Sequence, residues 1–180
     1  MKKLFTLLLG ILIISCSSDG MHPDFEKNKK AAETFFKLHG EENLEAMKDM
    51  LSDDLDWSSP KYGEGMINKD QQLKYIEGYQ TNYKDISFEA KYWLPGVDTL
   101  SLKNDGSVRV YGTWTGIHEK TGTSFKLDSY HTMAFNAEGK IVGGGDWFDL
   151  GGFLVGSTTP TAQEPILREA ISGDEYSGDE

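Results

Sequence analysis

Few residues of this chain have the types and spacing that catalysis or metal binding requires. Its 180 residues include one cysteine, Cys16, and four histidines. A single cysteine excludes a disulfide within the chain and a multi-cysteine zinc site. No HxH or HExxH spacing occurs, so we expect no metal and no cofactor. The run Gly143-Gly144-Gly145 is not a phosphate loop, because no Lys-Ser/Thr pair follows it.

Cys16 ends a segment that reads as a targeting signal. Lys2 and Lys3 precede an apolar run, Leu4–Ile14, that is too short to span a bilayer as a permanent helix. The letters IISC at its end resemble the bacterial lipobox, the signal for diacylglyceryl transfer to a cysteine and for cleavage before it. The sequence therefore predicts a signal peptide over residues 1–15 and a lipid anchor on Cys16. The alternative is a secretory signal whose cysteine is incidental.

A lipid on Cys16 and the residues after it would hold the protein at a membrane, and its charge disfavours nucleic acid as a partner. Each buried methylene of an acyl chain on Cys16 contributes about 0.8 kcal/mol, which is enough for stable anchoring. Residues 16–24 are small and polar, as expected of a flexible tether. A formal net charge of −11 argues against nucleic acid as a partner, which needs clustered Lys and Arg. We expect a protein of the bacterial cell envelope, anchored to the outer membrane by its lipid.

The body of the chain shows two hydrophobic periods. Apolar residues first recur at three and four positions, which predicts helices; beyond Asp85 the period changes to two, which predicts strands. The expected helices cover residues 24–39, 43–51 and 68–83, and the expected strands cover 55–58, 86–94, 108–118, 125–135 and 140–148. Asn104-Asp105-Gly106 is expected to form a hairpin turn. The order predicts one α+β domain over residues 25–155, with helices packed on one face of a curved antiparallel sheet.

The end of the chain differs in composition from the body. Ser157–Gln163 reads as a linker, and the residues from Glu164 onward carry six acidic side chains against one arginine. We therefore expect residues 156–180 to form an acidic, disordered and solvated tail.

Two segments of the body resemble the SnoaL-like branch of the nuclear transport factor 2-like superfamily. Residues 42–60 are similar to the second helix, acidic turn and first strand of that family, and residues 139–149, which begin with GKI, are similar to its final strand. The resemblance implies an α+β roll: a strongly curved sheet forms a cone around a long helix and leaves a deep, mostly apolar pocket. Members include isomerases, cyclases and proteins with no known catalysis, and homodimers are frequent.

Within this resemblance, chemistry of the ketosteroid isomerase type is disfavoured. It needs a carboxylate base and buried donors for a developing oxyanion. In that subfamily the base directly precedes a proline, and the matching residue here, before Pro60, is Ser59. The position of the subfamily's tyrosine donor is occupied by Phe35. Ser59 is not a base unaided, and Phe35 has no proton to donate.

Chemistry of the polyketide cyclase type would use the late strands, where Asp146 and His131 are the candidates for proton abstraction and for polarising a carbonyl. Desolvation in an apolar cone would raise the pKa of such a carboxylate. Whether His131 and Asp146 share a face depends on the register of the hairpin. If Phe135 pairs with Lys140, they lie on the same face, and if Asn136 pairs with Lys140, they lie on opposite faces. A second bulge in the glycine run would change this register again. The alternative for Asp146 is to accept a hydrogen bond from a nearby Tyr, Trp or amide, and for His131 a structural role.

Aromatic residues are numerous, with nine Phe, eight Tyr and four Trp. Most belong in the core, but Trp57, Tyr79 and Trp114 are expected to line the cone and hold a ligand.

The first hypothesis is a lipoprotein whose cone binds a small apolar or aromatic molecule. The second is a cyclase- or isomerase-like enzyme that uses Asp146 with His131, and the third is a dimeric protein-interaction module.

Overall fold

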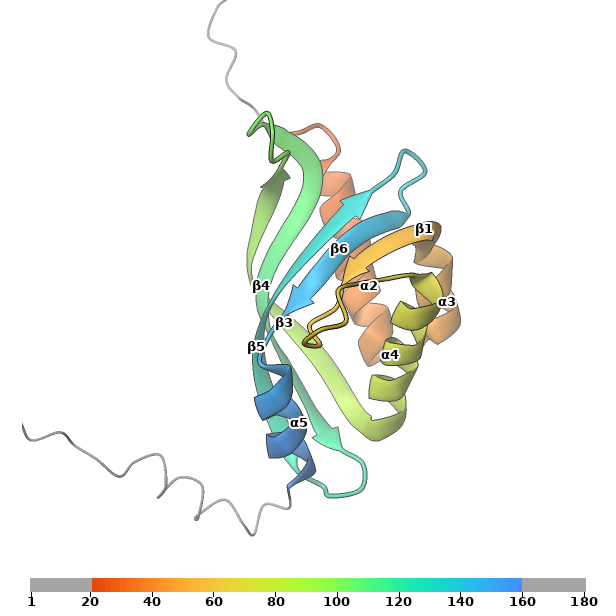
Figure 1. Ribbon diagram of the computed structural model, residues 1–180, viewed down its shortest axis with the longest axis vertical. Coiled ribbons are helices and arrows are strands. Elements are labelled where there is room, and N and C mark those ends of the chain that lie inside the picture. Colours follow the sequence, from red (N-terminus) through yellow and green to blue (C-terminus); the bar gives the residue numbers. More distant parts are fainter. Residues whose placement is uncertain (1–20, 160–180) are drawn as a thin grey trace, which may run out of the picture.

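The computed structural model describes residues 21–159, so the signal segment with Cys16 and the chain beyond residue 159 lie outside the described residues. Helices α2 (Phe25–Gly40), α3 (Leu44–Met50) and α4 (Lys69–Asn82) cover one side of a curved sheet, and α5 (Leu150–Thr158) lies at one end of it (Figure 1). The strands are β1 (Leu51–Ser58), β2 (Met66–Ile67), β3 (Tyr83–Val97), β4 (Asn104–His118), β5 (Ser124–Phe135) and β6 (Ile141–Trp147). The predicted α+β cone is confirmed.

Helices α2, α3 and α4 begin where the sequence pattern predicts. The Asn43 side chain accepts a hydrogen bond from the first turn of α3, and Asn68 forms a reciprocal capping box with Gln71 at the start of α4. Helix α2 buries Phe35 and Phe36 on the face that packs against the sheet. Within the described residues, no helix is both long and apolar enough to span a bilayer.

The sheet is mixed, so the prediction of a wholly antiparallel sheet is wrong for one pair of strands. Its order is β2-β1-β6-β5-β4-β3, and β1 runs parallel to β6, with Trp57 opposite Gly144. The chain leaves β1 through the short β2 and α4 before it enters the antiparallel meander β3 to β6. The last strand of that meander returns beside β1 in the same direction, and this places Trp57 next to the strand that carries Asp146.

The turn between β3 and β4 comes earlier than predicted. Val97 pairs with Asn104, so residues 98–103 make the turn and the prediction at Asn104-Asp105-Gly106 is wrong. Gly106 has a φ of 81°, and its carbonyl oxygen accepts a hydrogen bond of 2.9 Å from Asn28 Nδ2. The positive φ of Gly106 therefore belongs to an irregularity in β4, at the point where Asn28 of α2 bonds to the strand.

The last helix, α5, includes residues predicted to be tail. That prediction is wrong for residues 156–158, because α5 continues to Thr158. Asp149 caps the helix by accepting a hydrogen bond of 2.9 Å from the Gly152 N–H. The hydroxyls of Tyr83 and Ser157 lie 2.8 Å apart in the interior. Glycines lower the intrinsic helix propensity of this segment, so tertiary contacts stabilise a helix that the sequence pattern does not show.

Candidate functional site

The register of β5 and β6 places His131 directly opposite Asp146, on the sheet face toward the helices. Phe135 pairs with Ile141, and the next residue of β6, Val142, has no partner in the ladder. Val142 is therefore a β-bulge. Without it, every later residue of β6 would move by one position, and the Asp146 side chain would point to the outer face.

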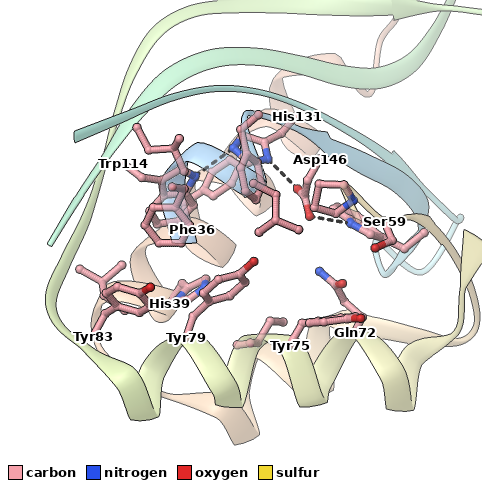
Figure 2. A pocket seen from close by; sticks show the side chains of 18 of the residues that line it. Phe36, His39, Ser59, Gln72, Tyr75, Tyr79, Tyr83, Trp114, His131 and Asp146 are labelled. Atoms are coloured by element: carbon pink, nitrogen blue, oxygen red, sulfur yellow. Dashed lines mark hydrogen bonds and ion pairs between the residues drawn. The ribbon is translucent and has the colours of Figure 1, made fainter. Parts of the chain in front are cut away.

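A cavity opens beneath this pair, between the sheet, α2, α4 and α5 (Figure 2). The five site residues that the sequence analysis named in the described chain all line it: Trp57, Tyr79, Trp114, His131 and Asp146. Their roles in binding or catalysis stay predictions. The cavity has a volume of about 100 Å³, which is less than the roughly 150 Å³ of an apolar cavity known to hold benzene. The part of a ligand inside it is therefore no larger than about one ring.

Two ring N–H groups hold Asp146. Trp57 Nε1 donates to its Oδ2 at 2.8 Å, and His131 Nδ1 lies 2.6 Å from its Oδ1 (dashed lines in Figure 2). Trp57 and His131 are buried, with exposed fractions of 1% and 3%, whereas the Asp146 side chain is 19% exposed. Both bonds stabilise the ionised carboxylate, and a carboxylate has about four lone-pair sites, so acceptor capacity remains for a ligand.

His131 lies behind Asp146 with both ring nitrogens in hydrogen-bond contact. Trp114 Nε1 donates to its Nε2 at 2.9 Å, and the Ser129 hydroxyl is 2.8 Å from the same nitrogen. Because an indole N–H can only donate, Nε2 must be the acceptor, and the ring proton must lie on Nδ1, where it points at Asp146. His131 is therefore the neutral Nδ1–H tautomer, and it positions the carboxylate.

Two polar side chains of α4 face Asp146 across the cavity. Figure 2 shows the Tyr79 hydroxyl and the Gln72 amide pointing from α4 into the cavity. Burial, and to a smaller extent the Asp146 carboxylate, raises the pKa of Tyr79, so its hydroxyl stays protonated and can donate. Gln72 is buried, and it is not among the residues predicted from the sequence. Its spacing of four from the buried Ile76 is the signal that could have found it.

His39, near the end of α2, also lines the cavity, although the sequence analysis gave it no chemistry. Its ring centroid lies 5.2 Å from that of Trp114 and 6.2 Å from that of Tyr79. Its Nδ1 is buried and has no hydrogen-bond partner among the described residues. Burial lowers the pKa of His39 against the opposing effects of its backbone and of Asp146, so the ring is neutral at pH 7. The helical period of α2 was the signal for its inward position.

The loop between β1 and β2 forms one edge of the cavity through residues 59–61. Glu64 holds this loop to α4: the Ser59 hydroxyl donates to Glu64 Oε2 at 2.5 Å, and the Tyr75 hydroxyl donates to Oε1 at 2.6 Å. Lys61 Nζ lies 3.7 Å from the same carboxylate. The edge of the cavity therefore carries an ammonium that already has a carboxylate partner.

Ser59 and Phe35 occupy the positions of the base and of the oxyanion donor in ketosteroid isomerase chemistry, and both line the cavity. Neither side chain carries the required group. The hydroxyl at Ser59 donates to Glu64, and Phe35 contributes an apolar ring. Among residues 21–159, no group of three or more His, Cys, Asp or Glu side chains is arranged to hold a metal ion.

Replacing Tyr75 with phenylalanine is expected to reduce the stability that the loop gains at neutral pH. Hydrogen bonds from Ser59 and Tyr75 hold the pKa of Glu64 below its ordinary value of 4.5. A carboxyl whose pKa is lowered by folding stabilises the folded state above its ordinary pKa, and this stabilisation is lost as the pH falls through the lowered pKa. The urea midpoints of wild type and Tyr75→Phe should therefore differ most near pH 7 and converge as the pH falls through the lowered pKa of Glu64. The matched control is Tyr62→Phe, whose ring is fully exposed, and a Tyr75→Phe difference that did not change with pH would contradict the interpretation.

The family model of the SnoaL-like domain matches residues 32–144, which is more than half of the chain. No curated protein matches the sequence. A similar solved structure is that of SalBIII, described as an epoxide hydrolase/cyclase-like enzyme in pyran ring formation in the polyether salinomycin. The two are 18% identical with a TM-score of 0.58, over 70% of this chain and 93% of that chain.

Two further structures have the same fold. A Catenulispora acidiphila protein with a ketosteroid isomerase-like fold, in complex with trimethylamine, is 14% identical with a TM-score of 0.58, over 72% of this chain and 93% of that one. AusH from Aspergillus nidulans is 13% identical with a TM-score of 0.59, over 73% and 88% of the two chains. These likenesses show the fold alone. With the family match over residues 32–144, the chain belongs to the SnoaL-like domain family.

Proposed function

We propose that this protein binds a small, partly apolar molecule in the cavity, and that the polar end of the ligand contacts Asp146. The observation that carries the proposal is the Asp146 carboxylate, held by Trp57 and His131 in a wall made mostly of rings. Ligand sites typically combine an apolar wall with a few precisely placed polar groups. The Tyr79 hydroxyl and the Gln72 amide, which point into the same space (Figure 2), supply further hydrogen-bonding groups.

The size of the cavity limits the ligand. Its volume of about 100 Å³ limits the part inside to no more than about one ring, and a larger molecule would extend past residues 59–61. One structural relative is described in complex with trimethylamine, which is a ligand of comparably small size.

A membrane anchor is part of the proposal. The lipobox-like letters IISC support attachment of acyl chains to Cys16, and the anchor would hold the domain at the outer membrane of the cell envelope. Metabolic labelling with an alkyne analogue of palmitate should mark the wild-type protein and leave Cys16→Ser unmarked. Equal labelling of both would contradict the anchor.

A second candidate function is proton transfer in an isomerase- or cyclase-like reaction, which the position of Tyr79 opposite Asp146 favours (Figure 2). Asp146 would take a proton from the carbon beside a carbonyl, and the electron pair of the C–H bond would form an enolate. The Tyr79 hydroxyl would donate a hydrogen bond to the enolate oxygen. His131 would hold Asp146 in place without exchanging a proton with the substrate.

A homodimer is a separate proposal. Tyr92, Tyr111, Tyr130 and Trp147 are cross-strand neighbours in one row over β3 to β6, and three of them are exposed on the outer face. Analytical ultracentrifugation tests it directly, since a monomer at all concentrations would contradict it.

The tryptophans provide an internal control for ligand binding. Trp57 and Trp114 line the cavity, whereas Trp93 and Trp147 do not. In ¹H–¹⁵N spectra, a titration with benzyl alcohol should shift the indole N–H signals of the first two in a saturable way and leave the other two in place. Equal shifts of all four would contradict binding in the cavity, and so would the absence of a saturable shift with every one-ring probe, charged or neutral.

A further inference from the structure

The cavity carries a negative charge that its own partners do not neutralise. Trp57 and His131 both donate N–H bonds to Asp146, and both hydrogen bonds favour the ionised carboxylate. Neither partner is a cation, since an indole is neutral and the Trp114 N–H fixes His131 as the neutral tautomer. Asp146 is therefore a charge solvated by dipoles and not a member of an ion pair.

The other titratable groups of the wall leave this charge in place. Burial lowers the pKa of His39 and raises that of Tyr79, so both are neutral at pH 7. Lys61 is paired with Glu64 at the edge of the cavity and is 58% exposed. The described side chains that line the cavity, together with Glu64, therefore sum to one negative charge.

The rings around Asp146 suit a cation. Trp57, Tyr79 and Trp114 line the same space as the carboxylate, and the faces of such rings attract ammonium groups through their quadrupoles. A partly desolvated charge without a counter-ion is costly, and a cationic partner offsets part of that cost. An anionic ligand would instead meet a like charge, and a neutral alcohol would supply a hydrogen bond without a charge.

We propose that the ligand of the cavity is an organic ammonium compound whose N–H donates to Asp146 and whose apolar body, no larger than about one ring, packs on the surrounding rings. This proposal rests on the proposed function, because it names the class of molecule that the same cavity binds. The formal net charge of −11 favours the approach of such a cation through long-range attraction.

Three probes with the same ring separate charge from shape: benzylamine, benzyl alcohol and benzoate, which are cationic, neutral and anionic at pH 7. Each is titrated into wild-type protein at physiological salt, with the indole N–H signals of Trp57 and Trp114 as the readout. We expect benzylamine to bind about tenfold more tightly than benzyl alcohol, and benzoate to give no saturable shift. The signal of the exposed Trp147 reports attraction to the acidic surface.

Each outcome has a definite meaning. If benzyl alcohol binds as tightly as benzylamine or more tightly, the ammonium proposal is wrong and the proposed function stands. If none of the three probes binds, the proposed function is wrong as well. Equal benzylamine shifts at all four tryptophans would identify surface attraction and overturn the ammonium proposal.

The variant Asp146→Asn removes the charge and keeps the shape. The preference for benzylamine over benzyl alcohol should disappear in it, and it should persist in Asp56→Asn, a matched change at an exposed position of the neighbouring strand. A preference that survived in Asp146→Asn would overturn the proposal. If Asp146→Asn does not fold, the order of the three probes on the wild-type protein still decides.

Discussion

Replacement of Asp146 with alanine is expected to lower the free energy of unfolding by about 2–4 kcal/mol. The substitution leaves the Trp57 and His131 N–H groups, which both point at the carboxylate, without an acceptor. Both residues are buried, and each unpaired buried donor costs about 1–3 kcal/mol. Removal of a partly desolvated charge offsets some of the loss. Urea unfolding at neutral pH, followed by tryptophan fluorescence, measures the difference.

Two variants bracket this result. Asp56→Ala makes the same change at an exposed position one residue before Trp57, and it should stay within about 0.5 kcal/mol of wild type. Asp146→Asn keeps one acceptor oxygen, so its stability should lie between those of wild type and Asp146→Ala. If Asp146→Ala were as stable as Asp56→Ala, the two ring hydrogen bonds could not be present as described.

Replacement of Phe36 with alanine is expected to cost about 3–5 kcal/mol of the free energy of unfolding, the range for a buried phenylalanine. The ring is 7% exposed and stacks on Phe88 with centroids 4.3 Å apart. Its centroid also lies 5.5 Å from that of Trp114 and 5.2 Å from that of His131. The truncation therefore leaves a void beside His131, which holds Asp146, and beside Trp114, which donates to His131.

Phe36→Leu is the matched comparison, because leucine fills most of the same volume. Its cost should stay below about 2 kcal/mol. Equal costs for the alanine and leucine variants would show that the shape of the ring, and not the void, determines the loss. A cost below about 1 kcal/mol for Phe36→Ala would contradict the packing described here.

The fold could be predicted largely from local patterns. Asn43 and Asn68 stand at helix starts because their side chains accept backbone hydrogen bonds there, and alternating residues after Asp85 predict strands in the same way. Such signals lie within a few residues of one another, and sequence reasoning reads them well. The parallel pairing of β1 with β6 joins segments nearly ninety residues apart (Trp57 opposite Gly144), and no local pattern records it.

Helix α5 shows the opposite case, in which tertiary contacts outweigh local preference. Gly151, Gly152 and Gly156 make the segment a poor helix by composition, and its end has the composition of a linker. The helix exists because Phe153 and Ser157 are buried against the sheet and α4. Propensity alone could not reveal that burial.

The candidate site could be named from the sequence but not assembled. Asp146 and His131 can be named as candidates from their residue types. Whether they share a face depends on the single extra residue Val142, and one-residue bulges leave little trace in a sequence. The neutral state of His131 depends on the Trp114 N–H, a contact between different strands. Gln72 was missed because a helical glutamine is usually exposed.

The ring nitrogens of His131 give the most direct test of the central claim, that a neutral imidazole holds an unneutralised Asp146 in the cavity wall. Multiple-bond ¹H–¹⁵N correlation spectra at neutral pH distinguish a protonated ring nitrogen from one with a lone pair. We predict a proton on Nδ1 and none on Nε2. A proton on Nε2, alone or together with one on Nδ1, would contradict the account, because Trp114 could then not donate to that nitrogen.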